Sequence, residues 1–137
     1  MNKNKTLEDI KVNVKIKLSA LWVTLMSLYI YADFFALHNP GGIEKIIKGF
    51  LGPFAITQQS LLMASVLMII PGIMIFFSLV LKAKVSRYTN IIIGILYTLV
   101  NIGNLIGESF IYYILFGVIE MIITLLIVFY AWKWPKN

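Results

Sequence analysis

The sequence predicts an all-α protein: a four-transmembrane-helix bundle with a short interfacial amphipathic helix between spans one and two. Composition supports this class, because 60% of the 137 residues are hydrophobic and only 13% are charged, whereas about a quarter of the residues in soluble domains are charged. Four apolar stretches also reach or approach the ~20 residues that cross a bilayer core. They cover residues 18–37, 61–81, 88–106 and 111–132, so we treat residues 1–137 as one integral membrane domain.

Basic residues predict how the chain is oriented. Ten of the twelve Lys and Arg residues lie in three short stretches beside apolar runs: Lys3, Lys5, Lys11, Lys15, Lys17, Lys82, Lys84, Arg87, Lys133 and Lys136. By the positive-inside rule, both termini and the connection between spans two and three are expected in the cytoplasm. The same placement argues against nucleic acid as a partner, because the charges flank the spans and form no separate binding face.

The first span follows a basic leader of residues 1–17. Its apolar run is longer than that of a cleaved signal peptide, so we expect a signal anchor. A turn is expected at residues 38–42, His-Asn-Pro-Gly-Gly. Apolar residues then recur at helical spacing over residues 43–54, with charged residues on the other side. We expect a helix that lies in the outer interface and ends at Pro53, with a re-entrant segment as the alternative.

The second span contains Pro71 and Gly72 near its midpoint. Proline removes one backbone hydrogen bond, so a kink is expected, and a neighbouring helix or water must satisfy the carbonyl group that is freed. A simple packing kink and a kink beside a cavity both fit this pattern.

The third span has the clearest polar face. Its members recur at offsets of 0, 4, 7, 11, 14 and 18 residues: Asn90, Gly94, Tyr97, Asn101, Asn104 and Glu108. This spacing places them on one side of a helix whose other faces are mostly Ile, Leu and Val. A helix of this kind lines either a hydrated cleft or a buried polar seam.

Glu120 is the strongest pointer to a site, because it is the only charged residue in residues 111–132. It lies about eight residues from the outer end of its span, which is roughly 12 Å of helix. Intramembrane acids usually face a bundle interior or a water-filled cavity. We therefore predict an outward-facing ligand-binding pocket that narrows toward Glu120. Its other candidate residues are Tyr29, Asp33, Gln58, Tyr97, Asn101, Asn104, Glu108 and Tyr113.

The sequence leaves two states of Glu120 open. No Lys, Arg or His lies inside any predicted span, and burial without a counter-charge favours the neutral form of a carboxyl group. In one interpretation, Glu120 is a neutral acid hydrogen-bonded to Tyr29, Tyr97 or Asn101. In the other, its charge changes when a cationic ligand or a proton arrives, as in coupled transport.

The sequence offers little for catalysis or metal binding. The lone His38 lies in a turn without Ser or Cys arranged around it, so no catalytic residue is assigned. Asp33, Glu108 and Glu120 lack the His ligands typical of transition-metal sites, so no metal site is assigned. The chain has no phosphate loop and no dinucleotide fingerprint, and no cofactor is expected.

Three segments carry a resemblance to a known family. Residues 11–22 (KVNVKIKLSALW), 31–35 (YADFF) and 40–42 (PGG) resemble a family of uncharacterised small bacterial four-span membrane proteins. In size and outline the chain is also similar to DoxX-like proteins. The resemblance implies a four-helix membrane bundle in the cytoplasmic (inner) membrane of a bacterium, and it implies no function.

Three functions remain open. The favoured one is a protein that binds or transports a small polar or cationic solute, coupled to protons through Glu120. The second is a scaffold or interaction protein whose polar residues form internal hydrogen-bond seams. The third is a membrane enzyme that acts on a lipid or quinone-like substrate. The expected partners are the lipid bilayer and a small polar or cationic ligand, and a homodimer, which would widen the narrow interior, is left open.

Overall fold

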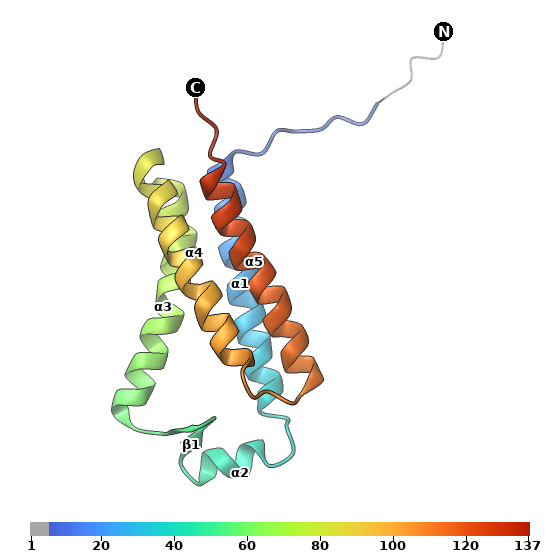
Figure 1. Ribbon diagram of the computed structural model, residues 1–137, viewed down its shortest axis with the longest axis vertical. Coiled ribbons are helices and arrows are strands. Elements are labelled where there is room, and N and C mark those ends of the chain that lie inside the picture. Colours follow the sequence, from blue (N-terminus) through green and yellow to red (C-terminus); the bar gives the residue numbers. More distant parts are fainter. Residues whose placement is uncertain (1–5) are drawn as a thin grey trace.

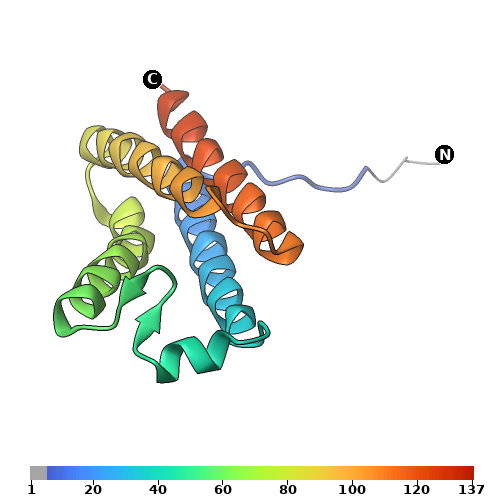
Figure 2. The ribbon, with the colours of Figure 1, turned by 60° about the horizontal axis from the view of Figure 1, so that its bottom comes forward.

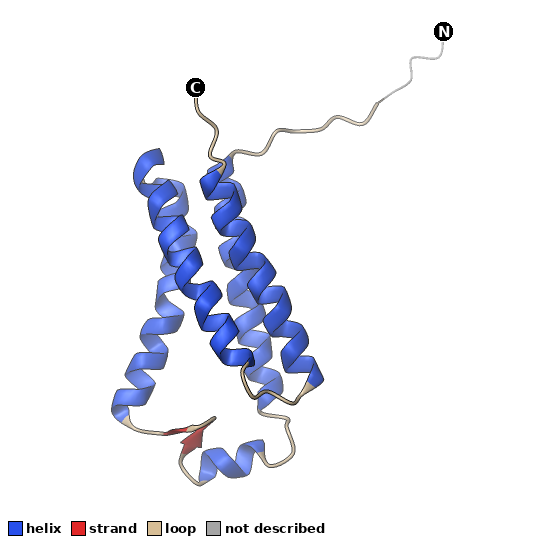
Figure 3. Cartoon of the chain, viewed as in Figure 1, coloured by secondary structure: helices blue, strands red, loops and turns tan. Residues whose placement is uncertain are grey.

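The computed structural model describes residues 6–137 and contains four long helices (Figure 1). They are α1 (Val14–Ala36), α3 (Gln58–Val80), α4 (Ala83–Leu105) and α5 (Ile111–Trp132). Each has 22 or 23 residues and is apolar enough to cross a membrane. The predicted all-α, four-helix membrane bundle is therefore confirmed, and Figure 3 shows how little of the chain lies outside helices.

The bundle is organised around α1. This helix packs against both α3 and α5, α4 packs along α5, and α3 makes few contacts with α4 although the two are consecutive. Figure 2 shows α3 on one side of α1 and α5 on the other. We call the end with the C-terminus, the start of α1 and the α3–α4 connection the terminal end, and the opposite end the hairpin end (Figure 1).

The helices at the terminal end begin earlier than the apolar stretches predicted. The first helix starts at Val14, because the Asn13 side chain accepts a hydrogen bond from the Lys15 amide at 2.9 Å and caps it. The helix α4 starts at Ala83, which brings Lys84 and Arg87 into its first two turns. Hydropathy alone misses such ends, since charged first turns at a membrane surface are helical but not apolar.

A helix was predicted over residues 43–54, but it ends at Ile47, so the second half of this prediction is wrong. The helix α2 spans only Gly42–Ile47, and the strands β1 (Phe50–Leu51) and β2 (Phe54–Ala55) follow it as a small antiparallel hairpin. Gly49 and Gly52 adopt positive φ angles of 89° and 56°. These left-handed positions stop the helix and form the turn, so Pro53 lies in the hairpin turn and does not end a helix.

The helix α3 continues through Pro71, and its freed carbonyl group has a partner. Proline has no N–H to donate to the carbonyl four residues earlier, which is that of Leu67. The hydroxyl group of Tyr97 on α4 donates a hydrogen bond to this Leu67 carbonyl. A neighbouring helix therefore supplies the donor that the sequence required.

The helices α4 and α5 approach each other closely at Gly94. A Cβ atom placed there would lie 2.8 Å from Cγ2 of Val128 and 3.3 Å from Cγ2 of Ile127. One turn away, the hydroxyl group of Thr98 donates to that of Thr124 at 2.9 Å. The small residue and the hydroxyl pair fix the register of these two helices.

Candidate functional site

A fully hydrogen-bonded polar cluster occupies the part of the bundle nearer the terminal end. The indole N–H of Trp22 donates to Oδ1 of Asn90 at 2.7 Å, and the Ser78 hydroxyl group donates to the same oxygen at 3.2 Å. The Asn90 amide group donates to the Ser86 carbonyl at 2.8 Å. We call these four residues the Asn90 seam. It ties α1, α3 and α4 together, and all four side chains are fully buried.

Tyr97 belongs to this structural part of the interior. Its ring lies edge-on to Trp22, with centroids 6.1 Å apart and planes at 90°. Its hydroxyl group donates its hydrogen bond to the Leu67 carbonyl on α3. Tyr97 was expected beside Glu120 as a hydrogen-bond partner, but the structure directs its hydroxyl group to the backbone of α3.

A second polar cluster lies nearer the hairpin end and is incompletely hydrogen-bonded. The hydroxyl group of Tyr29 on α1 donates to Oδ1 of Asn101 on α4 at 2.7 Å. Glu120 on α5 is only 5% exposed, and its carboxyl group lies within electrostatic range of Tyr29. We call these three residues the Glu120 cluster. Within residues 6–137, Nδ2 of Asn101 and Oε1 of Glu120 are buried without a hydrogen-bond partner.

These two unpaired atoms have complementary chemistry. The Asn101 amide nitrogen can only donate, and the carboxylate oxygen of Glu120 can accept. Buried polar atoms in folded proteins nearly always have partners, and an exception requires an explanation such as an unseen ligand or water. The Glu120 cluster is therefore the strongest candidate site in the described residues.

Between the hairpin end and this cluster, the side chains become progressively more buried. Asp33 is exposed, Tyr113 is half-buried, and Glu120 is buried. Tyr113 lies within electrostatic range of both Asp33 and Glu120. Polar groups thus connect the exposed rim of the bundle to the buried carboxyl group.

The remaining predicted pocket residues, Glu108, Asn104 and Gln58, lie near the hairpin end of the bundle. Oε1 of Glu108 accepts hydrogen bonds from the amides of Ser109 and Phe110, at 2.8 and 2.9 Å, and so holds the turn that precedes α5. Asn104 and Gln58 are exposed at the end of α4 and the start of α3. The structure does not bring these residues into the Glu120 cluster.

Sequence reasoning missed three buried serines, Ser19, Ser78 and Ser86, and the half-buried Tyr112. The serines gave little signal, because a small hydroxyl group in a helix often bonds its own backbone. The hydroxyl group of Tyr112 is buried without a partner within residues 6–137. Its ring packs near Phe35 and Phe110, with centroids 6.4 and 6.0 Å away. Tyr112 lies beside Tyr113 but off the polar face, so spacing could not reveal it.

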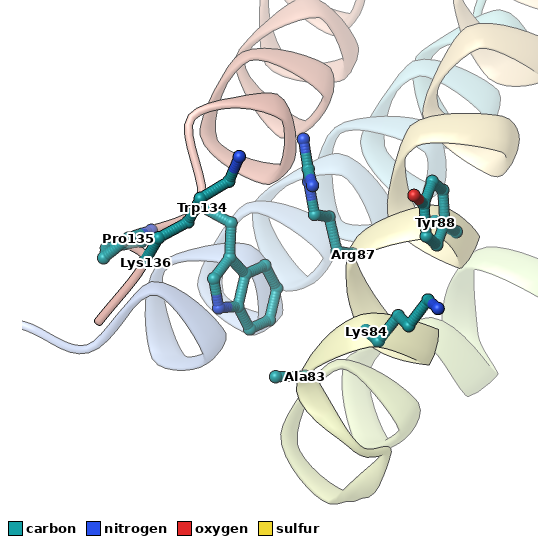
Figure 4. Close-up of a pocket in the computed structure, with 7 residues that line it drawn as sticks. All are labelled: Ala83, Lys84, Arg87, Tyr88, Trp134, Pro135 and Lys136. Carbon is teal, nitrogen blue, oxygen red and sulfur yellow. The ribbon is translucent and has the colours of Figure 1, made fainter.

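Two pockets on the surface lie away from the Glu120 cluster. One, of about 390 Å³, is apolar and lies over α5 beside Leu125 and Phe129. The other, of about 270 Å³, lies at the terminal end and is basic (Figure 4). Within residues 6–137, no group of three His, Cys, Asp or Glu side chains is placed to hold a metal ion.

Fold and site together define a small polytopic membrane protein: a four-helix bundle with one satisfied and one unsatisfied polar cluster in its interior. The model of a family of unknown function, DUF6326, matches residues 6–137, and the chain belongs to this family. Comparisons with curated proteins and with solved structures gave no match. The resemblance to an uncharacterised family of small membrane proteins is thereby confirmed, and the family carries no function with it.

Proposed function

We propose that the protein binds a small polar or cationic solute at the Glu120 cluster, entering from the hairpin end. The observation that carries this proposal is the pair of buried, unpaired atoms, Nδ2 of Asn101 and Oε1 of Glu120. A solute with one acceptor and one N–H or cationic group would satisfy both atoms at once. The gradient of burial from Asp33 to Glu120 supports entry from that side.

The charge distribution favours a cationic solute or a proton as the counterpart of Glu120. The basic residues of the long helices, among them Lys15, Lys84 and Arg87, lie in the first turns at the terminal end. Since no basic side chain of residues 6–137 pairs with it, Glu120 is expected to hold a proton when the site is empty. Binding of a cation would then release this proton, which couples solute binding to protons.

Transport would require the Asn90 seam to open. On the terminal side of the Glu120 cluster, the interior is closed by this seam and by the buried apolar residues Leu18, Leu25 and Met74. The helix α3 contributes Ser78 to the seam and has few contacts with α4. Movement of α3 is therefore the change that would open a route through the bundle.

Glu120→Gln tests this function in the full chain purified in detergent. Methylammonium and tetramethylammonium serve as probes, with binding and proton release measured by calorimetry in buffers of different ionisation enthalpy. We expect the variant to lose binding and proton release while its helix content is retained. Glu44→Gln, which removes an exposed acid of α2 at the same end but outside the candidate pocket, is the matched control and should bind within about threefold of the natural chain.

A scaffold role is the second candidate, and the completeness of the Asn90 seam favours it. If Glu120→Gln binds both probes as the natural chain does but unfolds at a different denaturant concentration, the Glu120 cluster is an internal seam. The solute-binding proposal would then be wrong.

We further propose a bacterial cytoplasmic membrane as the location, with both termini in the cytoplasm. Both described ends of the chain lie at the terminal end (Figure 1), together with eight of the ten Lys and Arg residues of residues 6–137. The positive-inside rule supports this orientation, and the sequence resemblance supports the bacterial source.

A further inference from the structure

A basic pocket lies at the terminal end, apart from the Glu120 cluster. Lys84, Arg87 and Tyr88 line it from the start of α4, and Trp134 and Lys136 line it from the segment after α5. Figure 4 shows the indole ring of Trp134 facing the first turns of α4, with Arg87 beside it. Two segments far apart in the sequence therefore enclose one space of about 270 Å³.

The pocket has an excess of positive charge. Three of its lining side chains are cationic and none is acidic. Of the six acids in the chain, Asp33, Glu44, Glu108 and Glu120 belong to the hairpin end or the middle of the bundle. The other two, Glu8 and Asp9, are exposed in the segment before α1. An anion is thus the ligand that this lining favours.

Arg87 is held in position by the protein itself. Its Nε and Nη2 atoms donate to the carbonyl groups of Ala131 and Trp132, both at 3.2 Å. A guanidinium group has five N–H donors, so these two bonds leave donors for a ligand. The planar group suits phosphate oxygens, and fixing it in advance reduces the entropy lost when a ligand binds.

The aromatic side chains place the pocket at the membrane surface. Tyr88 lies near the start of α4 and Trp134 lies just after the end of α5, and the Arg87 guanidinium group is 5.7 Å from the centre of the Tyr88 ring. Tyr and Trp are enriched at the depth of lipid headgroups. Basic pockets between transmembrane helices bind anionic lipid headgroups.

We propose that this pocket binds a phosphate group of an anionic ligand at the membrane surface. Arg87 provides the fixed contact, Lys84 and Lys136 add charge from two sides, and Trp134 covers the apolar part of the ligand. The phosphate comes either from a lipid headgroup or from a free small phosphate, and the chemistry of recognition is the same.

The test uses the full chain in a zwitterionic detergent and three probes: short-chain phosphatidylglycerol, short-chain phosphatidylcholine and inorganic phosphate. Binding is measured by calorimetry. We expect phosphatidylglycerol to bind saturably and more tightly than phosphatidylcholine. Saturation by phosphatidylglycerol alone identifies a lipid headgroup as the source. Saturation by inorganic phosphate, lost in the same variants, identifies a free phosphate. Failure of both anions to saturate would overturn the proposal.

Two double variants separate the pocket from general surface charge. Lys84→Gln with Lys136→Gln removes two exposed lysines of the pocket, and we expect roughly ten- to thirtyfold weaker binding of the anionic probe. Lys11→Gln with Lys133→Gln removes the same charge from the same end outside the lining, and we expect a change of less than about threefold. Equal weakening in both double variants, each with the helix content of the natural chain, would show diffuse attraction and no binding pocket.

Discussion

Asn90 and Asn101 lie on one face of α4, about three turns apart, and the exposed fraction of each side chain is 0%. Their surroundings nevertheless differ. Asn90 is bonded to Trp22, Ser78 and Ser86, whereas Asn101 is bonded only to Tyr29 and keeps an unpaired amide nitrogen. At the scale of single residues, one polar stripe therefore contains both a structural seam and a candidate binding site.

Replacing each asparagine with leucine should separate these roles. Asn90→Leu leaves three buried groups without their partner, so we expect a loss of about 1–3 kcal/mol in the free energy of unfolding. Asn101→Leu removes one hydrogen bond together with an unpaired donor, so we expect a loss of about 1 kcal/mol or less. Denaturant titration followed by circular dichroism in detergent measures both. An equal loss in the two variants would contradict this division of the stripe.

The hydrogen bond from Tyr97 to Leu67 should depend on Pro71. In the natural chain, Tyr97→Phe leaves the Leu67 carbonyl without a donor, and we expect a loss of about 0.5–1.5 kcal/mol in the free energy of unfolding. In a Pro71→Ala background, the new backbone N–H can bond that carbonyl, so Tyr97→Phe should have almost no effect. A double-mutant cycle measures the coupling. If the two losses simply add, the hydroxyl group does not replace the donor that proline lacks.

At the scale of elements, α4 and α5 approach closely at Gly94, where the missing side chain leaves room for Val128 and Ile127. Gly94→Ala would bring a methyl group within 2.8 Å of Val128, and we expect a loss of about 1–3 kcal/mol in the free energy of unfolding. The matched control is Gly103→Ala in the same helix, where a Cβ atom meets nothing within 4 Å. That control should be neutral or stabilising by up to about 1 kcal/mol.

A double variant separates the effect of the contact between α4 and α5 from the effect of alanine on helix propensity. Adding Val128→Ala to Gly94→Ala removes the atom that the new methyl group meets, so the double variant should lose less stability than the sum of the two single variants. Strict additivity would show that Gly94 is not a contact point between α4 and α5.

The elements show what the sequence could predict and where it could not. Long apolar runs sufficed for the four spans, because only a helix can satisfy its own backbone in hydrocarbon. The segment after α1 was harder, since Ile43, Ile47 and Phe50 fit a helical period even though the chain turns at Gly49. The glycines were the available signal, and weighing them above the apolar period would have predicted the hairpin.

The polar interior was predictable by face but not by partner. Spacing placed Tyr97, Asn101 and Glu120 toward the interior, where the structure has them buried. Which groups meet depends on the relative shift of neighbouring helices, which no single-helix pattern contains. The proline at position 71 did require a donor for Leu67, yet only the packing of α4 on α3 makes Tyr97 that donor.

At the scale of the whole molecule, two basic residues of the terminal end also donate hydrogen bonds to carbonyl groups at the C-terminal ends of helices. Nζ of Lys15 donates to the Leu81 and Leu79 carbonyls at 2.6 and 3.3 Å, at the end of α3. Arg87 does the same for the end of α5 through Ala131 and Trp132. Cations at helix C-termini are favourable for unpaired carbonyl groups and for the helix dipole. The side chains on which the proposed orientation rests thus also stabilise the fold.

Cysteine labelling tests the proposed orientation directly, because the natural chain has no cysteine and serves as the unlabelled control. Glu44→Cys places a thiol in α2 at the hairpin end, and Asn137→Cys places one at the C-terminus. In intact bacterial cells, a membrane-impermeant maleimide should label the first variant and should label the second only after permeabilisation. The reverse pattern would place the terminal end outside the cytoplasm.

The hydrogen bonds that join α1 to α4 have a consequence for how a ribosome can deliver this protein. Trp22 and Asn90 are 68 residues apart, and Tyr29 and Asn101 are 72 residues apart. When α1 leaves the insertion machinery, the acceptors for its indole and phenol groups have not yet been synthesised. The first helix therefore lacks these native partners until most of the chain has been translated. Early helix pairs can form only provisionally, and the native bundle closes near the end of synthesis.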